Sequence, residues 1–287
     1  MRTTATFLKL LATRSVGTFL AAHSLDFAAS IAYRVLFSLF PLAILLAGIF
    51  GLVGRATGVQ ADVVDTIVDQ APLTDEGRAE LRRLLTAATR DLGAVGVLGA
   101  LGVIWAASGM IAATRTAIQL AWARQEQRSF LRGKLLDVAF VFLAGVVVLL
   151  SLVLSVVFRA VERATDALLD WFGPAAAVAS WLLGVALPAV LGFAVILLAY
   201  RILPPFRPAL RRIVPAALFA AAGIALLQQL FVVYLRHFGR YDVIYGSLGA
   251  IIAFLLFVYL AAAVFLLGVH VSRCWPRALR DARAAAA

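Results

Sequence analysis

The amino-acid sequence predicts an all-α, polytopic membrane protein with six transmembrane helices. Apolar residues make up 63% of the 287 positions and charged residues only 14%, whereas about a quarter of the residues of a soluble domain are charged. The segment 247–270 is almost purely apolar and long enough to cross a bilayer as a helix, which satisfies its own backbone hydrogen bonds in lipid. Comparable apolar segments recur along the chain. We expect spans at about 28–53, 93–113, 138–158, 174–200, 213–235 and 247–270.

These spans divide the chain into three parts. Residues 1–26 precede the first span, 27–273 form the membrane domain, and 274–287 form a tail. In the first part, Arg2, Lys9 and Arg14 alternate with apolar residues at a spacing typical of a helix that lies on the membrane surface. A frayed tail is the alternative for this part.

The first span contains three residues that share one helical face. Ser38 and Pro41 follow Arg34 by four and seven positions, and proline has no N–H to donate within a helix. An arginine is costly in hydrocarbon, so Arg34 is expected either to face the bundle interior or to extend to the interface. This face is the first candidate for a polar pathway.

The longest polar connection is 55–92, between the first and second spans. Its apolar residues recur at helical spacing on both sides of Pro72, and Thr74 precedes Asp75 and Glu76 as an N-cap would. We therefore expect an extracytoplasmic amphipathic helical hairpin. It would bind an envelope partner, cover the bundle as a lid, or simply pack on the spans.

The middle spans are distinguished by glycine, proline and glutamine. The second span begins with glycines at a three-residue spacing, which lets helix backbones approach closely, and Pro188 predicts a kink in the fourth. The fifth carries Gln228 and Gln229, and a buried amide needs a partner. Those glutamines belong either to the polar pathway or to an interhelical hydrogen bond. The glycines are Gly93, Gly96, Gly99 and Gly102.

A short polar segment precedes the sixth span. Gly246 suits a turn and Ser247 suits an N-cap, so this segment is expected to be the extracytoplasmic lip where the chain enters the bilayer. Its candidate site residues are Tyr241, Asp242, Tyr245 and Gly246.

The lip and the sixth span also carry a family resemblance. The run YGSLGAIIAFLLFVYLAAAVFLLG, together with Ala32-Tyr33 and Ser38-Leu39-Phe40-Pro41, resembles the YihY family, also called the virulence factor BrkB family. The resemblance extends from about residue 25 to 273. It implies a bacterial inner-membrane protein with six transmembrane helices. An older label of that family, the tRNA-processing ribonuclease BN, is tested against the residues below.

The distribution of charge predicts the orientation. Residues 1–26, 114–137, 201–212 and 273–287 hold sixteen Lys and Arg against four acidic residues, whereas 55–92, 159–173 and 236–242 hold nine against eleven. By the positive-inside rule both termini are cytoplasmic, and the hairpin and the lip lie outside. The formal charge of +11 is thereby explained by membrane orientation and contact with anionic lipids, without a nucleic-acid partner.

The sequence offers no constellation for catalysis or metal binding. His23 and His270 are expected at the cytoplasmic side and His237 at the opposite one, too far apart to share a metal. Cys274 is the single cysteine, which excludes a cysteine cluster. No cofactor, metal or enzymatic activity is predicted, and ribonuclease activity is disfavoured because no nucleophile or Walker motif is present.

Two functions from different classes remain. The first is a transporter or lipid translocase for an anionic or amphiphilic substrate, without its own ATPase, whose pathway includes Arg34, Ser38, Pro41, Gln228 and Gln229. The second is a non-transporting scaffold or assembly factor that binds an envelope partner through 55–92. Membrane lipids are expected partners in both cases, and the sequence is compatible with an oligomer.

Overall fold

The structure, a computed structural model, describes residues 2–38, 41, 92–123, 131–147, 186–238 and 248–284. Every regular element in these ranges is a helix, which confirms the predicted all-α class for them. The hairpin up to residue 91, the lip at 241–246 and parts of the first, third and fourth predicted spans lie outside the described residues. The hairpin and the number of six spans therefore stay predictions.

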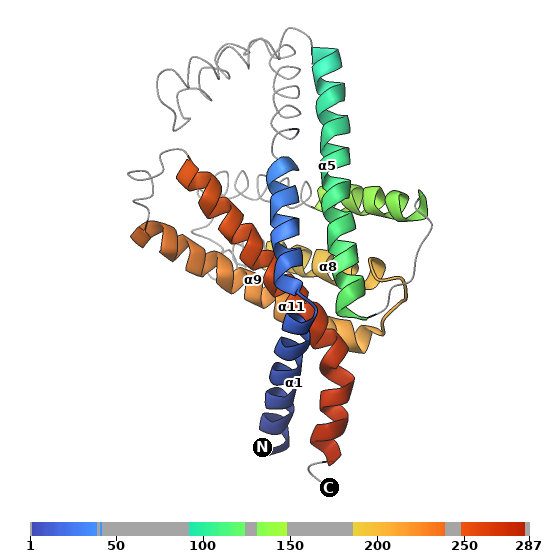
Figure 1. Cartoon of the computed structure of the whole chain (residues 1–287), viewed down its shortest axis with the longest axis vertical. Coiled ribbons are helices and arrows are strands. Elements are labelled where there is room, and N and C mark those ends of the chain that lie inside the picture. Colours follow the sequence, from blue (N-terminus) through green and yellow to red (C-terminus); the bar gives the residue numbers. More distant parts are fainter. Residues whose placement is uncertain are drawn as a thin grey trace, which may run out of the picture.

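The chain begins with two consecutive helices. α1 (Arg2–Ala21) ends at a tight turn, and a helix at 24–38 follows it (Figure 1). His23 closes the turn with a φ of 51°, and its amide donates to the carbonyl of Leu20 at 3.1 Å. α1 packs against α11. Residues 2–21 are thus helical rather than frayed, while their location on a membrane surface stays a prediction.

The helix at 24–38 runs antiparallel to α5 (Leu92–Ala121). A Cβ on Gly102 would lie 2.9 Å from the Cβ of Pro41, and a Cβ on Gly109 would lie 3.1 Å from Nη1 of Arg34. The absence of side chains at these glycines allows the two helices to approach closely, as predicted for the glycine-rich span. The next helix, at 131–147, also contacts α5 through polar pairs described below.

In the second half of the chain, the described ranges 186–238 and 248–284 contain two long helices and a shorter one. α8 (Leu187–Ile202) has Pro188 in its first turn, where a missing N–H removes no intrahelical bond. The connection that follows buries Leu203, and Arg201 donates to the carbonyl of Pro208. α9 (Leu210–Phe238) then packs on α8. The predicted kink at Pro188 concerns residues before 186, which lie outside the described ranges.

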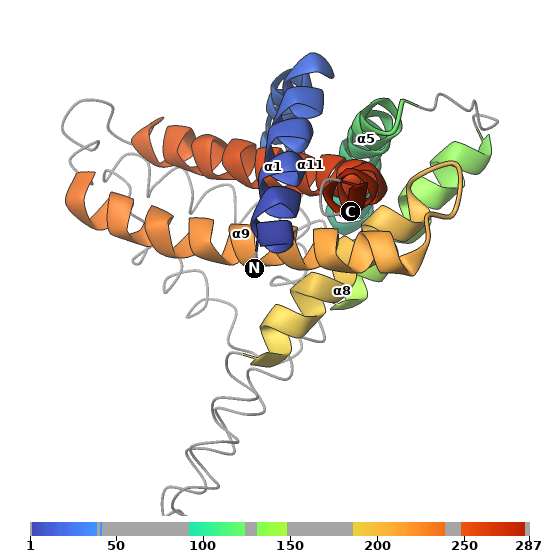
Figure 2. The same cartoon turned by 90° about the horizontal axis from the view of Figure 1, so that it is seen from below.

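α11 (Leu248–Ala284) is the central helix, and it contacts α1, α5 and α9. Gly268 permits its close approach to α8 and α9, because a Cβ there would collide with Oη of Tyr200 and lie 3.0 Å from the Cβ of Ala220. The Tyr200 hydroxyl donates to the carbonyl of Phe265 at 2.5 Å. In the view from below, α9 and α11 run side by side, and α1 crosses in front of them (Figure 2).

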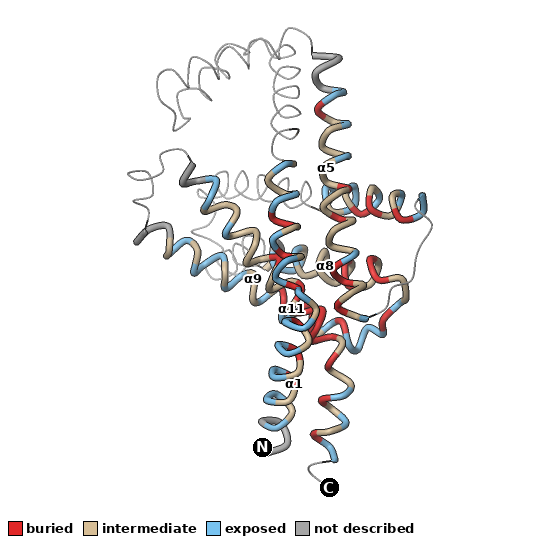
Figure 3. Tube along the Cα trace, in the orientation of Figure 1, coloured by how far each residue is buried: buried red, intermediate tan, exposed pale blue. Residues whose placement is uncertain are grey.

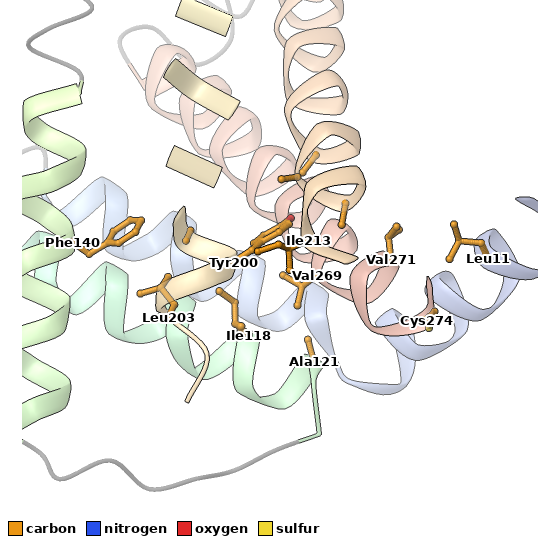
Figure 4. Packing of buried hydrophobic residues seen from close by; sticks show 14 of the residues in the cluster. Leu11, Ile118, Ala121, Phe140, Tyr200, Leu203, Ile213, Val269, Val271 and Cys274 are labelled. Carbon is orange, nitrogen blue, oxygen red and sulfur yellow. The ribbon is translucent and has the colours of Figure 1, made fainter. Parts of the chain in front are cut away.

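Buried residues are concentrated where α1, α8, α9 and α11 meet the end of α5 (Figure 3). Tyr200, Ile213 and Val269 lie at the centre of this core, with Ile118 of α5 beside them (Figure 4). A second cluster joins the helix at 24–38 to α5 and α11. Small residues dominate the contact between α9 and its neighbours, namely Ala216, Ala217 and Ala220, all fully buried.

Away from this core the helices expose large apolar side chains, as expected of a protein in lipid. Among the described helices, three are long and apolar enough to cross a membrane, at Val97–Ala121, Leu210–Tyr234 and Ile251–Ala284. They overlap the predicted second, fifth and sixth spans. The helices extend beyond the predicted spans, and α11 continues to Ala284 without a break at residue 270.

Candidate functional site

Arg34 and Pro41, two of the predicted pathway residues, lie together against α5. Nη1 of Arg34 occupies the space beside Gly109, and Pro41 occupies the space beside Gly102. Ser38 lies between them in the sequence and donates its hydroxyl to the carbonyl of Val35 at 2.6 Å. Within the described residues the Arg34 guanidinium has no hydrogen bond or ion pair. The Arg34 side chain is exposed, and the predicted face therefore brings a cation with no described partner beside Gly109, in the middle of α5.

A second cation reaches the same turn of α5 from the helix at 131–147. Nζ of Lys134 donates to Oγ of Ser108 at 2.6 Å and lies 5.2 Å from the centre of the Trp105 ring. The face of an aromatic ring attracts a cation. Ser108 is fully buried and donates in turn to the carbonyl of Trp105 at 2.8 Å. Lys134 thus has a hydroxyl and a ring as partners, and no carboxylate among the described residues.

Asp137 is the acidic residue nearest to Lys134 in the sequence, and it already pairs with Arg115. Its two oxygens accept from Nε and Nη2 of Arg115 at 3.0 and 3.1 Å, and its side chain is 1% exposed. This two-point pair attaches the helix at 131–147 to α5. Because the pair is neutral as a whole, the positive charges of Arg34 and Lys134 remain without a carboxylate in the described part of the chain.

The glutamines of the predicted pathway are located on a different helix. Gln228 and Gln229 are both exposed on α9, which packs on α8 and α11. No hydrogen bond within the described residues joins them to Arg34 or Lys134. Their place in the pathway stays a prediction, as does the role of the lip residues, which lie outside the described ranges.

A buried polar cluster connects α1 and the following helix to α11. Nε2 of His270 lies 3.0 Å from Oγ of Ser24, and Nδ1 lies 3.1 Å from Oγ1 of Thr18. Thr18 donates its own hydrogen to the carbonyl of Arg14 at 2.9 Å, so it accepts from Nδ1–H. Nε2 then accepts from Ser24, and His270 is a neutral structural link. Within the described residues no three His, Cys, Asp or Glu side chains are grouped as metal ligands.

Similarity to known proteins agrees with this membrane architecture. The model of the family described as "Virulence factor BrkB" matches residues 15–287. The chain belongs to the virulence factor BrkB family. This confirms the resemblance seen in the lip, the sixth span and the segment around Ser38 and Pro41.

Named relatives of this BrkB-family chain include two kinds of protein. The putative ribonuclease-like protein YfkH of Bacillus subtilis (strain 168) is 29% identical over 247 residues, covering 85% of this chain and 87% of YfkH. A UPF0761 membrane protein of Xanthomonas campestris pv. campestris (strain B100) is 28% identical over 290 residues. That alignment covers 93% of this chain and 64% of the relative, so the chain spans about two thirds of the Xanthomonas protein. No solved structure is significantly similar to this chain.

Sequence analysis missed the polar pairs that connect α5 to the helix at 131–147. The sequence predicts a basic cytoplasmic connection at 114–137, which contains Arg115, Lys134 and Asp137, because these residues stand outside the longest apolar runs. A signal was present, since Ser108 and Arg115 are seven residues apart and Lys134 and Asp137 three apart, which places each pair on one helical face. The sequence does not show that the two pairs meet, because this depends on the tertiary contact between the two helices.

Proposed function

We propose that this BrkB-family protein is an inner-membrane transporter or lipid translocase for an anionic or amphiphilic envelope substrate, without an ATPase of its own. The observation that carries the proposal is the placement of Arg34 and Lys134 beside one turn of α5. That turn, at Ser108 and Gly109, lies within the apolar stretch Val97–Ala121.

Two cations at this position favour an anionic group beside this turn of α5. A guanidinium or ammonium in an apolar bundle needs an acceptor, water or an anion nearby. In the described residues Ser108 supplies Lys134 with one hydroxyl acceptor, and the three donors of its ammonium are not all used. The five donors of Arg34 have no described acceptor. A phosphate or carboxylate of an amphiphilic substrate would supply the missing acceptors.

The orientation belongs to the same proposal. We place both termini in the cytoplasm, on the basis of the charge distribution along the chain. The start of α1 and the end of α11 lie at one end of the molecule, which supports a common side (Figure 1). The end of α5 lies beside α11, where Arg273 donates to the carbonyl of Ala121. The segment 55–92 would then be extracytoplasmic and available to an envelope partner.

We do not propose a ribonuclease, although one relative is called ribonuclease-like. Each acidic side chain in the described part of the chain has a basic residue beside it: Asp137 pairs with Arg115, Asp281 pairs with Arg14, and Asp26 lies 3.5 Å from Nδ1 of His23. Purified protein is therefore expected not to cleave tRNA precursors with divalent metal. Cleavage that follows the protein through successive columns and disappears in a point variant would contradict this.

Reconstituted vesicles test the proposal directly. Proteoliposomes carrying a fluorescent phosphatidylglycerol or phosphatidylcholine are treated with an impermeant quencher, and the rate of lipid exchange between leaflets is measured. We expect faster exchange of the anionic lipid than in protein-free vesicles, and a loss of this rate in Lys134→Met. Lys9→Met is the matched control, because Lys9 is an exposed cation on α1. Exchange at the protein-free rate for both lipids would favour the scaffold function.

A further inference from the structure

A basic cavity lies at the end of α5, apart from the cations in the middle of that helix. Its volume is about 690 Å³. Figure 1 shows the three elements that form it converging: the end of α5, the start of α9 and the last part of α11. Its lining includes Trp122, Arg212, Arg273, Arg277, Leu279 and Arg280.

The lining carries positive charge without a described carboxylate. Arg273 is fixed in place, because its Nη1 donates to the carbonyl of Ala121, the last residue of α5, at 2.7 Å. Within the described residues, the guanidinium groups of Arg212, Arg277 and Arg280 have no hydrogen bond or ion pair.

The acidic residue next to Arg280 does not neutralise the cavity. Asp281 pairs with Arg14 of α1 at 2.5 Å and is absent from the lining. The charge of the cavity is therefore not offset by the acid closest to it in the sequence.

The arrangement is unfavourable for the empty protein in two independent ways. Arg273, Arg277 and Arg280 follow one another by four and three positions on α11, where like charges repel. Arg212 stands in the first turn of α9, whose N-terminal dipole disfavours cations. An anion in the cavity would relieve both kinds of repulsion.

We propose that this cavity binds a phosphate group, carried either by an anionic phospholipid headgroup or by a soluble phosphate compound. The planar fork of arginine matches phosphate oxygens at two points. Basic pockets between transmembrane helices bind phosphorylated headgroups in this way. The ring of Trp122 and the side chain of Leu279 add apolar lining beside the guanidinium groups. Binding here does not depend on transport through the Arg34 and Lys134 region.

The test measures binding to the full-length protein in an uncharged detergent. Dissociation constants are determined for short-chain phosphatidylglycerol, for phosphatidylcholine with the same acyl chains, and for inorganic pyrophosphate. The cavity variant is Arg277→Gln/Arg280→Gln. Its matched control is Arg211→Gln/Arg283→Gln, which removes the same charge from two exposed arginines, one on α9 and one on α11, that do not line the cavity.

We expect phosphatidylglycerol to bind more tightly than phosphatidylcholine, and the cavity variant to lose affinity by about tenfold or more, the loss expected for charge-assisted hydrogen bonds. The control should retain the affinity of the wild-type protein. Pyrophosphate that binds and displaces the lipid identifies a soluble phosphate as a ligand, whereas binding of phosphatidylglycerol alone identifies the lipid.

Equal losses in the cavity variant and the control would overturn the proposal, because they would show attraction by net charge alone. Failure of both phosphatidylglycerol and pyrophosphate to bind would overturn it as well. Thermal unfolding checks that each variant is folded. Should the double cavity variant fail to fold, Arg212→Gln is compared with its sequence neighbour Arg211→Gln in the same way.

Discussion

The Arg115 guanidinium holds the carboxylate of Asp137 at two points, with Nε 3.0 Å from Oδ1 and Nη2 3.1 Å from Oδ2. The side chain of Asp137 is 1% exposed and that of Arg115 is 19% exposed. Removing one partner of a buried ion pair is strongly destabilising, because the other partner is left charged and buried without a counter-charge. The pair therefore fixes the helix at 131–147 against α5, and with it the position of Lys134.

Breaking this ion pair on one side is expected to destabilise the protein. Arg115→Met should lower the free energy of unfolding by about 3–5 kcal/mol, because it leaves Asp137 charged and buried. The double variant Arg115→Met/Asp137→Leu should recover most of this loss, since it removes both charges. Unfolding in detergent by denaturant measures each variant. A double variant less stable than Arg115→Met would show that the pair contributes more than mutual neutralisation.

Because Gly268 lies in close contact with α8 and α9, we expect alanine to lower the stability of the protein at Gly268 but not at Gly192. Gly268→Ala should destabilise the protein by about 1–3 kcal/mol, because its Cβ would collide with Oη of Tyr200 and approach the carbonyl of Ala216 to 3.1 Å. Gly192→Ala in α8 is the control. A Cβ there meets nothing within 4 Å, so alanine should be neutral or stabilising by up to about 1 kcal/mol. Equal melting temperatures for the two variants would contradict the close approach.

Substitution of Arg34 distinguishes an anion-binding role from simple extension to the membrane interface. Lysine would preserve the rate of lipid exchange if Arg34 only extends to the interface, since both side chains can do so. We expect Arg34→Lys instead to lower the rate about tenfold, because lysine lacks the planar fork that binds an oxyanion at two points. Arg34→Ala should lower it at least as much. Wild-type rates in both variants, with normal insertion and stability, would remove Arg34 from the proposed function.

The burial of Cys274 determines how the orientation can be tested. Its side chain is 4% exposed, and its sulfur lies 3.6 Å from Oγ1 of Thr18. An impermeant thiol reagent should leave this cysteine unlabelled from either side of the membrane. The informative variant is Cys274→Ala/Ala284→Cys, because Ala284 is exposed. We expect labelling only after spheroplasts are opened. Prompt labelling in sealed spheroplasts would reverse the proposed orientation.

The local features of the fold could be predicted from the sequence better than its long-range contacts. The uninterrupted apolar runs indicated the helices α5, α9 and α11, and the glycines of α5 indicated close packing, which the structure shows at Gly102 against Pro41. These features depend on residues close in the sequence. The contacts of Lys134 and Asp137 with α5 depend on how two helices cross. The sequence around these two residues is charged, and that charge by itself predicts a loop.

The uninterrupted length of α11 joins two environments. At about 1.5 Å per residue its 37 residues span about 56 Å, nearly twice the hydrocarbon thickness of about 30 Å. One continuous helix, which contains Pro276 and bends before its last part (Figures 1 and 2), thus carries both the apolar contact at Gly268 and the arginines of the basic cavity. A thinner or thicker bilayer changes the tilt of the apolar part of such a helix, and so raises or lowers the cavity relative to the headgroups. We therefore expect the affinity of the reconstituted protein for phosphatidylglycerol to vary with acyl-chain length, which makes bilayer thickness a regulator of the basic cavity.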